Sequence, residues 1–312
     1  MSGSFTPKTK WRKKQLVFVW LMLAIPILQF LVFFVYVNID SFIIAFQNFD
    51  YTNQVTEWTT DNFRFFFADL TQKEAIKTAM FNSLLVGLND AVLVIVSAML
   101  AYFFFKKVPG RNIFRIIFFL PSIISIVIYT MVFKYMFSAD MHGLIPETLM
   151  AFGVPEGDLP LWFSDPWLAR SLILIYCLWV GTGYNILILG GSMANIPSDV
   201  MEYSKLEGVS MFRELFQIVI PMIWPTISVA FIGSISVSFT LFMQVNLITG
   251  GLPHLIDGSG GATATISFLV NSMIGSNRER AAAYGLCFTA ISIPIILIAR
   301  KIMDVVNKKL GF

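Results

Sequence analysis

Charged residues are scarce in this chain. Of its 312 residues only 13% are Asp, Glu, Lys or Arg, whereas 56% are hydrophobic. A soluble domain averages about 25% charged residues, so the composition excludes an ordinary soluble domain and indicates an integral membrane protein. Lys and Arg gather only at the ends of hydrophobic runs, which argues against a nucleic-acid-binding surface.

Cysteine and histidine occur only twice each, and familiar catalytic motifs are missing. Cys177 and Cys287 lie inside apolar runs, so we interpret them as small buried hydrophobic residues rather than a disulfide or a metal site. His142 and His254 fall in expected outer loops and are interpreted as solvated. The chain lacks G-x-x-x-x-G-K-[ST], H-E-x-x-H and G-x-S-x-G. These absences predict a protein with no catalytic residues, metal or cofactor of its own.

Hydrophobic runs long enough to cross a bilayer recur along the chain. A transmembrane helix needs roughly 20 apolar residues. Six segments reach this length: about 16–37, 80–105, 113–137, 169–192, 223–248 and 282–304. The first follows a basic stretch and is too long for the apolar core of a signal peptide. We predict one all-α domain over 1–312, a polytopic membrane helical bundle of six spans.

The basic residues predict how the bundle is oriented. Positive charge accumulates in cytoplasmic segments, and a cytoplasmic N-terminus places fifteen of the 22 basic residues on that side: Lys8, Lys10, Arg12, Lys13, Lys14, Lys106, Lys107, Arg111, Arg115, Lys205, Arg213, Arg300, Lys301, Lys308 and Lys309. Six spans then put both termini in the cytoplasm. The segments 38–79, 138–168 and 249–281 fall outside, the last with GGATATISFLVNSMIGS as an expected interfacial or re-entrant helix.

One cytoplasmic connector, about 196–222, carries more charge and length than two packed spans require. Asp199 and Glu202 have the spacing of a capping box, and Gly208 supplies a left-handed helix stop. A second segment is predicted to be an amphipathic surface helix ending at Pro221. Its apolar side is expected to hold Met211, Phe212, Leu215, Phe216 and Val219, with Arg213, Glu214 and Gln217 opposite. A plain surface linker remains the alternative interpretation.

The connector IPSDVMEYSKLEGVSMFRELFQIVIPMIWP resembles the signature loop of binding-protein-dependent ABC importer permeases. The positions that agree are Glu202, Glu207, Gly208, Phe216, Ile218, Pro221 and Pro225, while Tyr203 and Ser204 replace two alanines usual in the family. FNSLLVGLNDAVLVIVSAMLAYFFFKKVPGRNIFRIIFFLPSIIS, LWVGTGYNILILGGSMANIPSDV and NLITGGLPH are similar to the carbohydrate-importing, maltose and multiple-sugar type. The resemblance covers most of the chain from about Phe81 onward.

The resemblance implies a non-catalytic permease subunit in a bacterial plasma membrane, with the type I importer architecture. It implies four partner chains: a second homologous permease, two ATPase subunits that bind ATP and Mg, and an extracytoplasmic solute-binding protein. The connector would be the helix that couples the permease to the ATPase. The residues implied in that coupling are Glu202, Tyr203, Leu206, Glu207, Gly208 and Pro221.

Polar residues inside the expected spans are candidates for a sugar path, because such residues are costly in lipid and usually face a bundle interior. Those weighed are Asn82, Asn89, Asp90, Tyr129, Tyr184, Asn185, Ser238, Thr240, Gln244 and Asn246. Hydrogen bonding between helices is the alternative for each. Trp179 would add an aromatic platform for a sugar ring. The resemblance implies Gly181, Tyr184, Ser238, Thr240 and Leu241, and with Asn185 and Gln244 these form the predicted path.

Three further points stay open in the sequence. Asp90 is protonated, paired or lining a wet path, and a partner in the companion permease is the interpretation we favour. The cargo is expected to be a sugar or oligosaccharide, with a non-sugar solute such as glycerol phosphate or a uronate oligomer as the alternative. An ion channel or scaffold without ATP coupling would not need the glycine-stopped connector.

Overall fold

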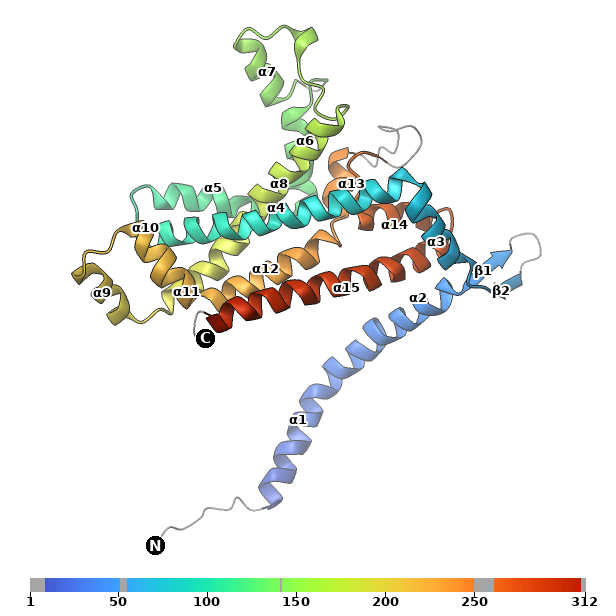
Figure 1. Cartoon of the computed structure of the whole chain (residues 1–312), viewed down its shortest axis with the longest axis horizontal. Helices are drawn as coiled ribbons and strands as arrows, with labels where there is room; N and C mark the ends of the chain where they lie inside the picture. Colours follow the sequence, from blue (N-terminus) through green and yellow to red (C-terminus); the bar gives the residue numbers. More distant parts are fainter. Residues whose placement is uncertain (1–8, 51–54, 141, 250–260, 310–312) are drawn as a thin grey trace.

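The computed structural model describes residues 9–50, 55–140, 142–249 and 261–309. Most of these residues are helical (Figure 1). Within the described ranges, the single helices long and apolar enough to cross a membrane are α4 (Glu74–Phe105), α8 (Pro166–Ala194) and α15 (Arg278–Lys309). Lys13–Ala45 is a fourth candidate, running through α1 (Thr9–Gln29), the π-helical η1 (Phe30–Tyr36) and α2 (Val37–Ala45). The expectation of a helical, multi-span membrane protein is confirmed.

Two bent helix pairs raise the possible number of spans to six. In the expected span 113–137, α5 (Arg111–Ile123) and α6 (Ile126–Phe137) meet at 113°. The bend follows Pro121, which lacks an N–H for the helical ladder, and Ile124, which is extended. The expected span 223–248 is also divided: α12 (Trp224–Ser238) ends before α13 (Met243–Thr249) begins.

The connector leads into α12 through a second sharp bend. It holds α9 (Ser198–Leu206), α10 (Met211–Glu214), the π-helical η3 (Leu215–Val219) and α11 (Ile220–Met222). The stretch Met211–Met222 meets α12 at 78°, with Ile223 between them. Pro225 stands in the first turn of α12, where a missing N–H costs nothing.

The expected outer segments are short elements rather than further long helices. The segment 38–79 contains the only strands among the described residues, an antiparallel pair of β1 (Gln47–Asp50) and β2 (Val55–Trp58), followed by α3 (Asp61–Gln72). The segment 138–168 contains α7 (Leu144–Ala151) and the 3₁₀ turn η2 (Glu156–Asp158). Within GGATATISFLVNSMIGS, Ile266–Ile274 forms the short helix α14 before α15, whereas GGLPH, including His254, lies outside the described residues.

The bundle is organised around α4, which packs along α8 on one side and α12 on another (Figure 1). At the connector end the core consists of Val94, Tyr102, Leu189, Met193, Leu215 and Val219, all nearly inaccessible. Gly183 lets α8 approach α5, because a Cβ there would overlap Ser122 Oγ and the carbonyl oxygen of Phe118. The connector core thus fixes the base of α9 to the ends of α4 and α8.

The N-terminal helix stands apart from this bundle (Figure 1). It meets the bundle where α2 packs against α15, and α1 diverges from there. Its large apolar side chains, among them Leu16, Trp20, Ile25 and Phe33, are exposed. Apolar surface of this extent is stable only when lipid or another protein covers it.

Candidate functional site

The connector forms a hooked projection whose tip is α9 (Figure 1). Gly208 reverses the chain with φ +66°, and a Cβ built there meets nothing within 4 Å. Backbone conformation, rather than lack of space, therefore requires glycine at this position. Val209 N donates to Ser204 O at 3.1 Å and Gly208 N donates to Lys205 O at 3.1 Å. These two bonds are the paired hydrogen bonds of a Schellman stop, as the sequence predicted.

The start of α9 differs from the expected capping box. The helix begins at Ser198 after Pro197, and no side chain caps it. Asp199 instead lies within the first turn, where its negative charge favours the positive end of the helix dipole. Pro197 ends the preceding chain in an extended conformation (ψ 133°), which shifts the helix start one residue upstream of Asp199.

The two faces of α9 differ sharply in exposure. Met201 and Ser204 are buried against the bundle. Tyr203 and Leu206 point outward with 69% and 83% of their surface exposed. Of the other residues predicted to couple, Glu202, Glu207 and Gly208 are also exposed, whereas Pro221 is half-buried in α11. An exposed tyrosine and leucine beside carboxylates form an amphipathic tip carried on a glycine-stopped turn.

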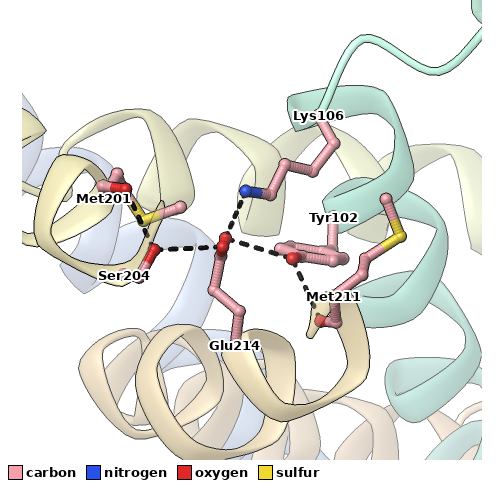
Figure 2. A network of polar contacts seen from close by, with 6 residues as sticks. All are labelled: Tyr102, Lys106, Met201, Ser204, Met211 and Glu214. Carbon is pink, nitrogen blue, oxygen red and sulfur yellow. Dashed lines mark hydrogen bonds and ion pairs between the residues drawn. The ribbon is translucent and has the colours of Figure 1, made fainter. Parts of the chain in front are cut away.

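A buried carboxylate anchors this projection to the bundle (Figure 2). Glu214 in α10 is only 3% exposed, and its Oε1 lies 2.5 Å from Lys106 Nζ. Tyr102 Oη donates toward the same oxygen and toward Met211 O, each at 3.1 Å. Ser204 Oγ in α9 lies 3.1 Å from Glu214 Oε2 and 2.9 Å from Met201 O. One carboxylate thereby joins α9, α10 and the C-terminal end of α4.

The charge state of Glu214 follows from these contacts. Burial by itself raises the pKa of the carboxyl group, but hydrogen bonds from Lys106, Ser204 and Tyr102 and the Lys106 charge outweigh it. The net pKa of Glu214 lies below its ordinary value, so the group is ionised at neutral pH.

Glu214 corrects the amphipathic pattern expected for the second connector segment. The sequence placed it on the polar side with Arg213 and Gln217, yet it is buried beside Leu215. Leu215 and Val219 are buried as expected, but Met211, Phe212 and Phe216 are exposed. The π-helical η3 shifts the register of the facing residues, so a regular 3.6-residue period does not describe this segment. Ser204, which departs from the usual alanine, is part of the same anchor.

The second candidate feature is a cavity of about 490 Å³ between α4, α8, α12 and the start of α13. Its polar lining includes Asp90, Tyr184, Asn185, Ser234 and Gln244. Five of the seven predicted path residues line it: Gly181, Tyr184, Asn185, Leu241 and Gln244. A cavity of this size with mixed apolar and polar walls suits a small organic ligand.

The other two predicted path residues lie outside the cavity lining. Ser238 is 1% exposed and faces Gly87 on α4, where a Cβ would come within 3.1 Å of its hydroxyl oxygen. Its hydroxyl donates to Ile235 O at 2.7 Å, and that of Thr240 donates to Val237 O at 3.0 Å. The expected platform Trp179 packs edge-on against Tyr129 with ring centroids 5.5 Å apart.

Two polar side chains of α4 hold the bundle together through hydrogen bonds to backbone carbonyl groups of other segments. Asn82 Nδ2 donates to Ala262 O and Ala264 O, each at 2.8 Å, and Asn82 Oδ1 accepts from Arg170 Nε. Asn89 Nδ2 donates to Leu174 O at 3.2 Å. Asp90, one residue further, is instead part of the cavity wall, 9% exposed, beside Cys177.

The family described as the binding-protein-dependent transport system inner membrane component matches residues 93–312. The maltose/maltodextrin transport system permease protein MalF of Yersinia pestis is 28% identical over 240 residues, which are 76% of this chain and 44% of that protein. The lactose transport system permease protein LacF of Rhizobium radiobacter is 33% identical over 167 residues, 54% of each chain.

A third relative, MalF of Vibrio parahaemolyticus serotype O3:K6, is 29% identical over 61% of this chain and 35% of its own length. The chain therefore spans less than half of these maltose relatives and about half of the lactose relative. Among solved structures, a bacterial ABC transporter involved in the import of the acidic polysaccharide alginate superposes with a TM-score of 0.75 at 19% identity. That match covers 96% of this chain and 100% of the other, and at this identity it establishes the fold alone.

Proposed function

Because the chain belongs to the family of binding-protein-dependent transport system inner membrane components, we propose that it is the permease subunit of an ATP-driven sugar importer. In this role it receives a sugar or oligosaccharide from an extracytoplasmic binding protein and passes it into the cytoplasm. The maltose/maltodextrin and lactose permeases to which it is similar support this class of cargo.

The observation that carries the proposal is the projecting connector, in which α9 ends at Gly208 and Glu214 anchors the base. Tyr203 and Leu206 are exposed at its tip, whereas Glu214 ties its base to α4 through Lys106. An apolar, exposed tip on a rigid base is suited to docking in a groove of a second protein and to transmitting rigid-body motion. Glu202 and Glu207 provide rim carboxylates for basic residues of that groove. The protein that receives α9 is an ATPase subunit, which binds the ATP and Mg that drive the transport cycle.

The assembly proposed around this chain has two ATPase subunits, a second homologous permease and one extracytoplasmic binding protein. The chain itself is a non-catalytic subunit, and it crosses a bacterial plasma membrane six times with both termini in the cytoplasm. The placement of α9 at the same end of the bundle as the C-terminus supports this orientation (Figure 1). The coupling loop is 196–222.

The cavity between α4, α8 and α12 is the proposed sugar path. Tyr184 offers an aromatic face to a pyranose ring, and Asn185 and Gln244 offer neutral donors and acceptors to hydroxyl groups. Gly181 lies in the same wall. Ser238 and Thr240 would contribute only after a change in the helix α12 that turns their hydroxyl groups from their present carbonyl partners.

Co-purification in mild detergent tests the class of machine. A tagged chain expressed with its native neighbours is expected to retain an ATPase and a second permease, and to bind a solute-binding protein. Recovery of the chain alone, from membranes in which those subunits are present, would contradict the importer proposal in favour of a channel or scaffold. The solute bound to the recovered binding protein would identify the cargo, and glycerol phosphate or a uronate oligomer there would overturn the proposed cargo in favour of the alternative.

A further inference from the structure

A buried carboxylate in the wall of the proposed sugar path has no structural partner. Asp90 lies at mid-length in α4, is 9% exposed, and borders the cavity together with residues of α8 and α12. Its neighbours Asn82 and Asn89 on the same helix each bond to backbone carbonyl groups. Within the described part of the chain, no hydrogen bond or ion pair joins the Asp90 carboxyl group to another residue. Its side chain therefore does not serve helix packing in the way its neighbours do.

The rest of the cavity wall is uneven in charge. Among the described lining residues there is no Lys, Arg or His, and Asp90 is the one carboxylate. The polar groups opposite it are neutral: Tyr184 and Asn185 on α8, Ser234 on α12 and Gln244 on α13. Lys134 and Arg170, near the ends of their helices, do not line this cavity. When Asp90 is ionised, a wall with one acid and no base repels anionic solutes and favours neutral or cationic ones, because few water molecules screen charges in a confined cavity.

We propose that Asp90 is a specificity-determining residue of the transport path, which accepts hydrogen bonds from the hydroxyl groups of an uncharged sugar and excludes anionic saccharides such as uronates. This inference rests on the proposed function, because it assigns the charge of the cargo that the cavity passes. A carboxylate takes two or more hydroxyl donors at once and holds each more strongly than a neutral acceptor does. The same charge raises the free energy of any carboxylated sugar beside it.

Charged thiol reagents test the inference without knowledge of the cargo. Ser234 lines the cavity on α12 and makes no hydrogen bond that a cysteine would lose. The native thiols are removed by Cys177→Ser and Cys287→Ser, and Ser234→Cys is then introduced. Full transporter complexes in membrane vesicles are labelled with either of two methanethiosulfonate reagents, the cationic trimethylammonium-ethyl or the anionic sulfonato-ethyl derivative. Each rate is divided by the rate of the same reagent with 2-mercaptoethanol. Asp90→Asn, which preserves side-chain shape, is compared with Asp90→Glu, which preserves charge.

We expect the cation-to-anion rate ratio at Ser234→Cys to fall about tenfold in Asp90→Asn, as one unit charge acting over several ångströms predicts, and to stay high in Asp90→Glu. Ser272→Cys, exposed on α14 outside the cavity, is the control whose ratio should not change. An unchanged ratio with good labelling would overturn the charge filter and leave the path intact. A loss of complex yield without a change in ratio would overturn it in favour of pairing with the companion permease. If neither reagent labels Ser234→Cys while both label Ser272→Cys, the cavity is closed to water, and both the inference and the proposed sugar path are wrong. Co-purification of the ATPase tests the importer class separately.

Discussion

Glu214 is a buried carboxylate that links the connector to α4. Its carboxylate pairs with Lys106 Nζ and accepts hydrogen bonds from Tyr102 Oη and Ser204 Oγ. Removing a charge of this kind from water is costly, so the network stabilises the native state only while all its members are present. Ser204 therefore has a structural reason to differ from the alanine usual at its position: its hydroxyl links α9 to the anchor.

Breaking the anchor on one side should be more damaging than removing both charges. Glu214→Ala and Lys106→Met are each expected to cost about 3 kcal/mol, or roughly 5 °C in the apparent Tm of the purified chain, because each leaves the other charge buried and unpaired. The double variant should lose less than the sum of the two. Ser204→Ala, which removes one hydrogen bond, should lose about 1 kcal/mol. Thermal unfolding followed by size-exclusion chromatography measures all four.

The pH dependence of this anchor has a definite sign. Because the folded-state pKa of Glu214 is lowered, its contribution to stability is complete above the ordinary carboxyl value near 4.5 and is lost as the pH falls through the folded value. A Tm that drops below pH 4.5 by the same amount in wild type and in Glu214→Ala would contradict this assignment.

At the scale of elements, one side of α9 packs against the bundle and the opposite side is exposed. Its buried side is held by Met201 and Ser204, and its outer side presents Tyr203 and Leu206. The Schellman bonds at Gly208 prevent the turn from continuing as a longer helix. The fold and the proposed docking therefore depend on different residues of the same two-turn helix.

This separation predicts a variant that folds but does not dock. Leu206→Glu, at a side chain 83% exposed, should leave expression and Tm unchanged while ATPase co-purification falls at least tenfold, because a charge would enter an apolar contact. Leu161→Glu is the matched control, since Leu161 is 69% exposed in the outer segment and should retain the ATPase. Equal recovery of the ATPase with both variants would contradict the docking role of α9.

At the scale of the whole molecule, large apolar surfaces remain uncovered. The N-terminal candidate span Lys13–Ala45 has no buried residues in its most apolar window, in contrast to 44% in α4 and α8. Such surfaces require lipid or a second protein. The described residues hold four candidate spans, or six if each bent helix pair, Arg111–Phe137 and Met211–Ser238, counts as one crossing.

The proposed topology is tested by labelling single cysteines from one side. In the Cys177→Ser, Cys287→Ser background, Phe152→Cys after α7 should react with a membrane-impermeant maleimide in intact spheroplasts. Phe152 is 84% exposed. Lys308→Cys, near the end of α15, should react only after permeabilisation. The reverse pattern would contradict a cytoplasmic C-terminus.

Local signals in the sequence determined the membrane class, the position of the apolar helices and the glycine stop after α9. Each depends on neighbours in the chain: apolar run length sets a span, and a positive φ needs glycine. The bend after Pro121 and the extended backbone at Ile124 were not predicted, because proline is common within spans and bends only where packing permits.

Only the tertiary structure decided the surroundings of individual polar residues. The sequence alone predicts a surface position for Glu214. In the folded chain it is buried because Lys106 and Tyr102, which is 112 positions away, lie beside it. Asn82 and Asp90 read alike in the sequence, yet one bonds to the backbone of Ala262 and Ala264 while the other borders a cavity. The physical reason is that the free energy of a buried polar group depends on contacts from distant segments, which no local pattern encodes.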